Sequence, residues 1–379
     1  MSRIASIDLL RGLVILIMMV DHVRERFFMH TSTGDPISEL VSPELYFTRY
    51  ITHFCAPIFV FLAGMSAWLY AHPHNKPARS PSLFLFKRGL VLIAFEVVLY
   101  YLVWIDTIAT TIWLQVLWAI GVSMIGLAVA SKLNYWLIGG LGFAIVFGHN
   151  ALTPITFSPD EWGFVIWSIL HDQNYIGEIF GLKIRASYPV LPWFGAILLG
   201  YFAGPLFAES MTASKRQKTL VVTGLTCLAI MLVLRGFNLY GETLPWEVKA
   251  TTLDTIRDFL NYSKYPPSLL YLLTTIGTGM LVLAWLDKQT TLNPVTKVLQ
   301  VFGSVPMFAY FAHLYLLLAA YWVLYAFIGA THGERFGLSS VWQIWLGAAL
   351  LVAVLYYPTL RFSIYKHKEK RSKPWLSYL

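Results

Sequence analysis

Long apolar segments, each of roughly the length that crosses a bilayer, follow one another along most of the chain. Hydropathy windows of about twenty residues predict about ten spanning helices, at 4–27, 48–70, 84–105, 109–130, 134–151, 189–208, 219–237, 267–286, 301–327 and 340–361. The polar connections are short except at 152–188 and 238–266. The pattern predicts an all-α, polytopic membrane protein with one transmembrane domain over 1–379 and a basic tail at 362–379.

The composition supports this class of protein. Hydrophobic residues make up 57% of the chain and charged residues 13%, whereas soluble domains carry about 25% charged residues. The two cysteines, Cys55 and Cys227, lie far apart in apolar segments, so no disulfide framework is expected. The first apolar run is too long for the core of a cleavable signal peptide and is expected to stay in the protein.

Charge sets the expected topology. The net charge of +8 belongs to a membrane chain, so no nucleic-acid partner is expected, and what matters is where the cations lie. Ten spans would place both termini on one side, and the connections on that side are rich in Lys and Arg. The positive-inside rule then predicts cytoplasmic termini in a cell inner membrane. The long connections at 152–188 and 238–266 would lie outside, either as an acceptor-binding vestibule or as interfacial anchors.

The first apolar segment carries charge where a spanning helix normally has none. His22 follows Arg11 by eleven positions, which is roughly 1100° of helical rotation and about 16 Å of rise, so the two side chains lie within about 20° in azimuth. Asp8, three residues before Arg11, can pair with it. Polar groups at membrane depth are costly and usually functional. We therefore expect a cleft along this face; the alternative is that the polar pairs only mark the helix ends.

Asp21 and His22 form the strongest candidate for catalysis. Imidazole has a reference pKa of about 6.5, so it can take a proton from a hydroxyl or amine, and a nearby carboxylate raises its basicity. Adjacent residues lie about 100° apart on a helix, so Asp21 need not touch His22. A carboxylate from another helix could orient the ring instead.

Other polar residues inside or beside apolar segments are candidates for substrate binding. His53 opens the second predicted span at the outer depth of His22, but no Cys/His ligand spacing accompanies it, so no metal is predicted. Glu96 lies mid-membrane, where a carboxylate must be protonated, paired or facing a wet cavity. We expect a cavity with a partner such as Arg11. His313 is also mid-span, either as a substrate-binding residue or as a packing histidine.

The remaining candidates lie at the ends of spans. Lys87 and Arg88 are at the predicted inner end of the third span. As structural residues they would anchor the helix by extending their charged ends to the membrane surface. As functional residues they would bind the phosphates of coenzyme A. Lys264 and Tyr265 precede two prolines at the outer start of the eighth span, where they would contact the acceptor.

Two resemblances connect these residues to known families. The arginine and histidine of RGLVILIMMVDH resemble the R-x(10)-H pair of the acyltransferase-three family of membrane acyltransferases. Longer strings resemble a bacterial family of unknown function that is grouped with the catalytic part of lysosomal heparan-alpha-glucosaminide N-acetyltransferase: SIDLLRGLVILIMMVDHVR, THFCAPIFVFLAGMS, KRGLVLIAFE, LWAIGVSMI, FGHN, YPVLPWFGAILLGY, NYSKYPPSLLYLL and VFGSVPMFAYFAHLYL.

The resemblance implies a helical membrane enzyme that takes an acyl group from cytoplasmic acyl-CoA and passes it to a sugar or related acceptor on the far side. Arg11 and His22 match the acyltransferase-three pair. Asp21 stands about where the lysosomal relatives have an asparagine, which leaves its role open. His30 is the nearest candidate for the lysosomal histidine of the first outer loop, and relatives suggest a homodimer.

The expected function is therefore an acyl-CoA-dependent O- or N-acyltransferase, with acetyl-CoA as the donor substrate and a sugar or glycan as the acceptor. His22 would act as general base in a ternary complex, with an acyl-histidine intermediate as the rival mechanism, and Arg11, Lys87 and Arg88 would face the CoA phosphates. Two alternatives remain. One is a proton-coupled small-solute transporter using polar groups within the membrane, and the other is a non-catalytic scaffold or flippase partner.

Overall fold

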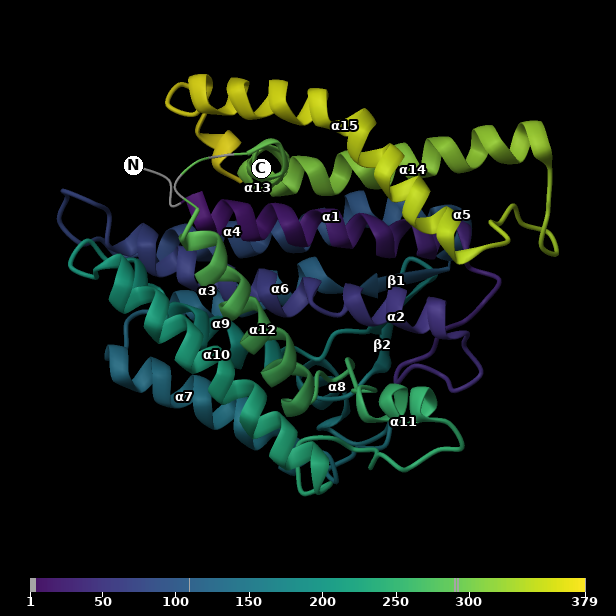
Figure 1. Ribbon diagram of the computed structural model, residues 1–379, viewed down its shortest axis with the longest axis horizontal. Coiled ribbons are helices and arrows are strands. Elements are labelled where there is room, and N and C mark those ends of the chain that lie inside the picture. Colours follow the sequence, from purple (N-terminus) through teal and green to yellow (C-terminus); the bar gives the residue numbers. More distant parts are fainter. Residues whose placement is uncertain (1–4, 109, 290, 292, 379) are drawn as a thin grey trace. The chain divides into compact units, whose positions relative to one another are not determined.

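The computed structural model describes residues 5–108, 110–289, 291 and 293–378. Its longer helices are α1 (Ala5–Phe27), α3 (Cys55–Ala71), α4 (Ser82–Ala94), α6 (Val116–Ala130), α7 (Tyr135–Gly148), α9 (Val190–Phe202), α10 (Ala213–Gly236), α12 (Leu269–Asp287), α14 (Pro306–Ile328) and α15 (Val341–Glu369) (Figure 1). Shorter ones are α2 (Pro43–Thr52), the π-helix η1 (Phe95–Tyr100), α5 (Tyr101–Ile108), α8 (Phe164–Leu170), α11 (Thr252–Phe259), α13 (Pro294–Ser304) and the 3₁₀ turns η2 (His149–Leu152), η3 (Gly204–Phe207) and η4 (Pro374–Ser377).

The predicted class of polytopic helical membrane protein is confirmed. Among the described residues, eight helical stretches are long and apolar enough to cross a membrane: Pro43–Ala71, Ser82–Thr107, Tyr135–Leu152, Val190–Phe207, Ala213–Gly236, Leu269–Asp287, Pro306–Ile328 and Val341–Glu369. The other two predicted spans correspond to α1, which has 23 residues but several charges, and to α6, which has 15. The predicted start of the first span at Ile4 lies outside the described residues.

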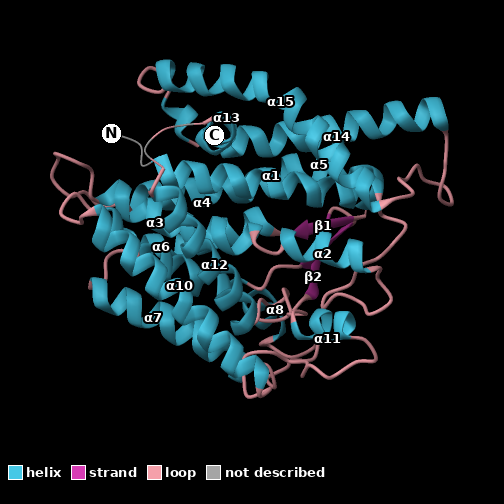
Figure 2. Cartoon of the chain, in the orientation of Figure 1, coloured by secondary structure: helices cyan, strands magenta, loops and turns pink. Residues whose placement is uncertain are grey.

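The prediction of a helix over 109–130 was wrong in its first part. Thr111–Leu114 form strand β1, and helix α6 starts only at Val116. β1 pairs in parallel with β3 (Leu182–Ala186), which pairs antiparallel with β2 (Asn174–Ile179), giving the order β1-β3-β2 (Figure 2). Threonine, isoleucine and tryptophan favour extended backbone, but hydropathy cannot distinguish a short apolar strand from a helix. The all-α expectation therefore missed this small sheet.

Prolines explain two other shifted boundaries. The predicted span 48–70 contains the end of α2 and all but the last residue of α3, with a break at His53 and Phe54, because Pro57 has no N–H to continue the helical hydrogen bonds across this point. The predicted span 301–327 begins inside α13, which ends at Ser304, and α14 starts at Pro306. A residue before proline is disfavoured in the helical region, and Val305 has φ −137°.

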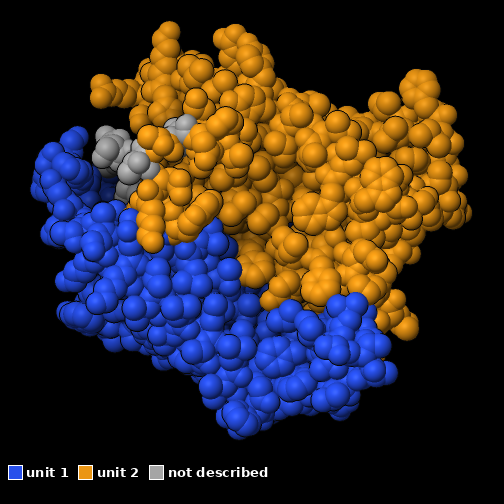
Figure 3. Space-filling model, in the orientation of Figure 1, with its two compact units in different colours: residues 1–2, 56–284 blue, residues 3–55, 285–379 orange. Residues whose placement is uncertain are grey.

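Two compact units divide the chain (Figure 3). Ala56–Ala284 belong to unit 1, and Arg3–Cys55 with Trp285–Leu379 form unit 2. The single-domain assignment over 1–379 stays a prediction. In unit 1, helices α3 and α9 touch through glycines: a Cβ on Gly64 would lie 2.0 Å from the Ile197 carbonyl oxygen, and one on Gly200 would lie 2.0 Å from that of Phe61. Small residues allow this close backbone approach between membrane helices.

Unit 2 is organised around α1. A Cβ on Gly12 would lie 1.9 Å from the Leu299 carbonyl oxygen of α13, and one on Gly303 would lie 1.8 Å from the Asp8 carbonyl oxygen. On another side, Val23 faces Gly347 of α15, where an added Cβ would lie 3.1 Å from the valine Cγ1. These contacts fix the rotation of α1 and thereby the direction of its polar side chains.

Candidate active site

The first helix brings His22 onto His313 of α14, 291 residues away in the chain. His22 Nδ1 and His313 Nε2 are 2.6 Å apart, and both side chains are buried. The rings stack with centroids 4.9 Å apart and an interplanar angle of 13°. Tyr310, one turn before His313, presents an edge to both rings at 5.8 and 5.7 Å. The two histidines were predicted as separate sites, and the structure joins them in one.

The contacts of His313 define how the pair can share protons. His313 Nδ1 lies 2.8 Å from the Ala309 carbonyl oxygen, which can only accept a hydrogen bond. The proton of a neutral His313 is therefore on Nδ1, and its Nε2 is an acceptor. His22 must then donate from Nδ1, which leaves its own Nε2 as the basic nitrogen of the neutral pair. A second residue thus fixes the tautomer of His22, as the supporting group of a catalytic histidine does.

The basic nitrogen of His22 has an acidic neighbour on its own helix. Glu25 Oε2 lies 3.8 Å from His22 Nε2, and the Glu25 side chain is half-buried, at 34% exposure. This separation is too long for a hydrogen bond but close enough for an ion pair with a protonated ring. The carboxylate is therefore placed to stabilise positive charge that develops on His22.

Asp21 was predicted as the catalytic partner of His22, and the structure gives its carboxylate other partners. Arg24 donates from Nε and Nη2 to Asp21 Oδ1 at 3.0 and 2.9 Å. Arg49 of α2 donates from Nη1 to both oxygens, at 3.0 and 2.7 Å. All three side chains are buried. Asp21 therefore joins α1 to α2 through a buried charge cluster, and its direct role in catalysis stays a prediction.

At the other end of α1, the expected pair of Asp8 and Arg11 is present. Arg11 Nη1 donates to Asp8 Oδ1 at 2.9 Å, and the Arg11 side chain is 21% exposed. His53, another predicted site residue of unit 2, is buried at the C-terminal cap of α2 with its ring 6.2 Å from that of Tyr50. In the part of the chain that the structure describes, no group of three potential metal-ligating side chains is found.

In unit 1, Glu96 lies in the π-helical turn η1 and is buried. Its Oε2 accepts hydrogen bonds from the backbone N–H groups of Leu117 and Trp118, at 2.7 and 3.1 Å. These donors open α6, where the helix macrodipole favours a negative charge. Oε1 has no hydrogen-bond partner among the described residues. The expected contact of Glu96 with Arg11 stays a prediction, since the two residues belong to different units.

The other predicted residues of unit 1 lie on separate elements. On α4, Lys87 is exposed, and the guanidinium of Arg88 lies 6.0 Å from the Phe84 ring centroid. Lys264 is buried, with its ammonium 5.1 Å from the ring centroid of Tyr265, whose hydroxyl donates to that of Tyr188 at 2.9 Å. Within unit 1, Lys87 and Arg88 thus lie on a different segment from Lys264 and Tyr265 and have different neighbours.

His30, the candidate taken from the first outer loop, is exposed beyond the end of α1. Its ring stacks on that of His332, with centroids 3.8 Å apart. Burial and the charge of His332 lower the pKa of His30 below its ordinary value. Two imidazoles in contact disfavour double protonation, so His30 is neutral more readily than an isolated histidine.

Sequence reasoning missed four residues of the site, Arg24, Glu25, Arg49 and Tyr310. The three-residue spacing of Asp21 and Arg24 is a signal for an ion pair on one helix. Arg49 could only have been noticed as a lone arginine between aromatic residues. No local signal indicates that Tyr310 borders both histidines, because this depends on how α14 packs against α1.

The chain matches a family of known proteins. No curated protein matches the chain closely enough to count as a relative. The family model described as the catalytic region of heparan-alpha-glucosaminide N-acetyltransferase matches residues 3–236. This segment contains Asp8, Arg11, His22 and Arg49, and it ends where α10 ends. The match covers more than half of the sequence, and the chain therefore belongs to the heparan-alpha-glucosaminide N-acetyltransferase catalytic family.

Proposed function

We propose that this membrane acetyltransferase moves an acetyl group from acetyl-CoA, bound on the cytoplasmic side, to a sugar or glycan acceptor on the far side of a cell inner membrane. Family membership gives the general activity and favours an enzyme over a transporter. The observation that carries the finer proposal is the contact between His22 and His313. It gives one buried imidazole a fixed tautomer in which Nε2 is the basic nitrogen.

The proposed reaction proceeds in a ternary complex. The acceptor hydroxyl or amine attacks the thioester carbonyl while His22 Nε2 takes its proton. The carbon–sulfur bond then breaks, and the CoA thiolate leaves and takes the proton from the imidazolium. His313 Nε2 accepts the Nδ1–H hydrogen bond throughout, and Glu25 stabilises the cationic ring. Both substrates held in one site remove much of the entropic barrier.

For the donor, we propose that Lys87 and Arg88 contact the CoA phosphates; the contact of Arg11 with these phosphates stays a prediction, since Arg11 belongs to the other unit. Lys87 is exposed and can supply a full charge, whereas the charge of Arg11 is partly offset by Asp8. Charge-assisted bonds to phosphate are strong, so Lys87→Ala and Arg88→Ala should each weaken acetyl-CoA binding more than Arg11→Ala. Cytoplasmic termini and a homodimer remain predictions that accompany this proposal.

The test uses purified protein in detergent with radiolabelled acetyl-CoA and an amino-sugar acceptor. His22→Ala should lower kcat by about 10²–10⁴-fold while acetyl-CoA binding, measured by calorimetry, is kept. Unchanged turnover in this variant would remove His22 from the mechanism. A covalently labelled wild-type protein would replace the ternary complex by the acyl-histidine route.

His313 is proposed as a positioning residue, so its test needs a readout beyond loss of activity. His313→Leu should lower kcat with little change in KM and should shift the pH profile of kcat. His313→Gln should restore part of the rate, because its amide can accept from His22 and donate to Ala309. His367→Leu is the control, since His367 Nδ1 also contacts a carbonyl four residues earlier, that of Ser363, at 2.7 Å. A rate that is equally low in the Leu and Gln variants would contradict the positioning role.

A further inference from the structure

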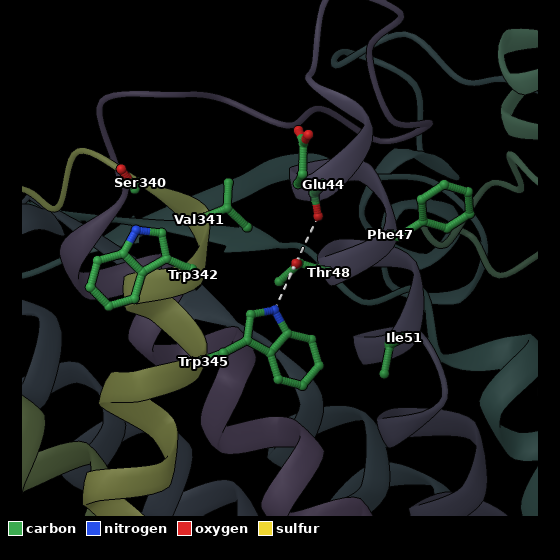
Figure 4. A pocket seen from close by; sticks show the side chains of 8 residues that line it. All are labelled: Glu44, Phe47, Thr48, Ile51, Ser340, Val341, Trp342 and Trp345. Atoms are coloured by element: carbon green, nitrogen blue, oxygen red, sulfur yellow. Dashed lines mark hydrogen bonds between the residues drawn. The ribbon is translucent and has the colours of Figure 1, made fainter.

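Polar side chains that lack a partner in the protein are one sign of a ligand site, and two surfaces outside the His22 site differ in this respect. In unit 2, a groove of about 570 Å³ lies between α2 and α15 (Figure 4). The Thr48 hydroxyl in this groove accepts from Trp345 Nε1 at 3.0 Å and donates to the Glu44 carbonyl at 2.8 Å. These groups are satisfied within the protein, whereas a row of side chains on the sheet of unit 1 is not.

This row consists of Trp113, Arg185 and Tyr175, one residue from each strand. Arg185 of β3 lies opposite Trp113 of β1 and opposite Tyr175 of β2, and residues directly opposite each other point to the same face of a sheet. The guanidinium carbon of Arg185 is 4.7 Å from the Trp113 ring centroid and 5.3 Å from that of Tyr175. The two rings flank the guanidinium in cation–π contacts and fix its position.

Arg185 is held in this place without an anion. In the part of the chain that the structure describes, no carboxylate forms an ion pair with it, and its Nε is buried without a hydrogen-bond partner. Nε1 of Trp113 is buried and unpartnered in the same way. Donors that have lost water and gained no acceptor are costly. Arg185 is only half-buried and Tyr175 is 48% exposed, so the row is open to a ligand that supplies the acceptor.

The charge of the sheet matches one negative group. Lys183 shares the face of Arg185, because residues two apart on a strand point to the same side, and Glu178 lies opposite Lys183. These are the charged residues of the three strands, and together they give a net charge of +1. A single carboxylate is therefore balanced here, whereas a polyanion would be only partly neutralised.

The surroundings of Arg185 favour a sugar over a lipid headgroup. Ile112 and Ile184 lie opposite each other and point to the other face of the sheet, so apolar strand residues face away from Arg185. Its own face carries Lys183 and Glu178, which offer hydrogen bonds and no surface for acyl chains. Aromatic rings beside polar donors suit a sugar, whose C–H groups pack on a ring while its hydroxyls form hydrogen bonds.

We propose that Arg185, held between Trp113 and Tyr175, binds the carboxylate of an acidic sugar. The planar guanidinium can donate two parallel hydrogen bonds to a carboxylate, and the exposed ring of Tyr175 can pack against the sugar. β2 and β3 belong to the connection 152–188, for which the sequence predicts a vestibule or an interfacial anchor. The inference rests on the proposed function only in taking the ligand to be a sugar, and its test needs no turnover.

The experiment measures binding of three soluble probes to the purified protein by calorimetry. Methyl glucuronide carries the carboxylate, methyl glucoside is its neutral counterpart, and glycerophosphoglycerol is the deacylated headgroup of an anionic lipid. The wild type should bind the glucuronide at least about tenfold more tightly than the glucoside, as expected for charge-assisted hydrogen bonds. It should also bind the glucuronide more tightly than glycerophosphoglycerol.

Variants then assign this preference to the row. Arg185→Gln should bring the ratio of the two sugar affinities close to one, and Arg185→Lys should give an intermediate ratio, because it keeps the charge but loses the planar fork. Trp113→Phe keeps a ring but removes the N–H and should weaken glucuronide binding by about threefold. Arg79→Gln is the matched control: Arg79 also lies over a ring, 3.8 Å from the Tyr70 centroid, but its Nε already donates to the Tyr70 carbonyl at 2.9 Å. This variant should keep the wild-type ratio.

Equal affinity of the wild type for glucuronide and glucoside would overturn the inference, and this comparison does not depend on any variant folding. A preference that survives Arg185→Gln would overturn it as well. Tighter binding of glycerophosphoglycerol that depends on Arg185 would assign the row to a lipid headgroup instead. Absence of acetyl-CoA binding and of acetyl transfer, with the glucuronide preference intact, would count against the proposed function and leave the anion site in place.

Discussion

Two buried carboxylates, Asp21 in unit 2 and Glu96 in unit 1, are compensated in different ways. Asp21 is bound by two guanidinium groups from Arg24 and Arg49. Glu96 is bound by two backbone N–H groups at the start of α6. The donors to Asp21 are charged arginine side chains, which a mutation can remove. The donors to Glu96 are backbone N–H groups of helix α6, which remain whatever the side chains are. The difference suggests that the Asp21 cluster depends on each member and that the Glu96 site tolerates loss of its charge.

The largest effect is expected from Asp21→Ala. This variant leaves two buried arginines without their shared counterion, which should destabilise the protein by about 3–5 kcal/mol. Thermal unfolding in detergent, followed by fluorescence, measures the shift. Asp254→Ala is the matched control, because Asp254 pairs with Arg257 at 3.0 Å and the same three-residue spacing but is 44% exposed. A similar shift in both variants would contradict the role of burial.

A double-mutant cycle should reveal coupling in the same cluster. In the Asp21→Ala background, Arg49→Met removes a charge that Asp21 no longer offsets and fills a similar volume, so it should cost less than in the wild type. The coupling free energy should be about 1–3 kcal/mol. Four unfolding curves, for the wild type, the two single variants and the double variant, give this value. Additive shifts would mean that Asp21 and Arg49 do not depend on one another.

Glu96→Gln should have a smaller effect, of about 1 kcal/mol. The glutamine oxygen can still accept from Leu117 and Trp118, and its NH2 group takes the place of Oε1, which has no hydrogen-bond partner among the described residues. Asp21→Asn is the informative comparison, because an amide cannot neutralise two arginines, and its shift in unfolding temperature should clearly exceed that of Glu96→Gln. The reverse order would disprove the proposed difference between the two sites.

The smallest effect is expected at the pair of the exposed His30 and the half-buried His332, where solvent screens the charges. The pKa of His30 is lowered in the folded protein, so the unfolded chain binds more protons in the interval below its ordinary pKa of about 6.5. Stability should therefore be complete above about pH 6.5 and should fall as the pH drops toward the lowered pKa. His332→Gln should reduce this fall. Unfolding temperatures of the wild type and His332→Gln at about pH 7.5 and about pH 5.5 test this prediction. An equal decrease in unfolding temperature in both proteins would rule out charge repulsion between His30 and His332.

Local patterns were sufficient for the features that depend on neighbouring residues. Apolar segment lengths predicted the class of polytopic helical protein, and the three-residue spacing of Asp8 and Arg11 predicted their ion pair. His22 could be selected as a candidate because an imidazole beside a carboxylate is unusual in an apolar segment. Each of these inferences needs only the geometry of one helix.

Only the tertiary structure decided what the candidate residues contact. The partner of His22 is His313, and the partner of Asp21 from outside its own helix is Arg49, 28 residues away. Glu96 is met by backbone N–H groups, which every helix start offers and no sequence pattern marks. The strand Thr111–Leu114 exists because β3 lies beside it. Contacts between distant segments depend on how helices rotate and pack, and close glycine contacts such as that of Gly12 with Leu299 fix this rotation.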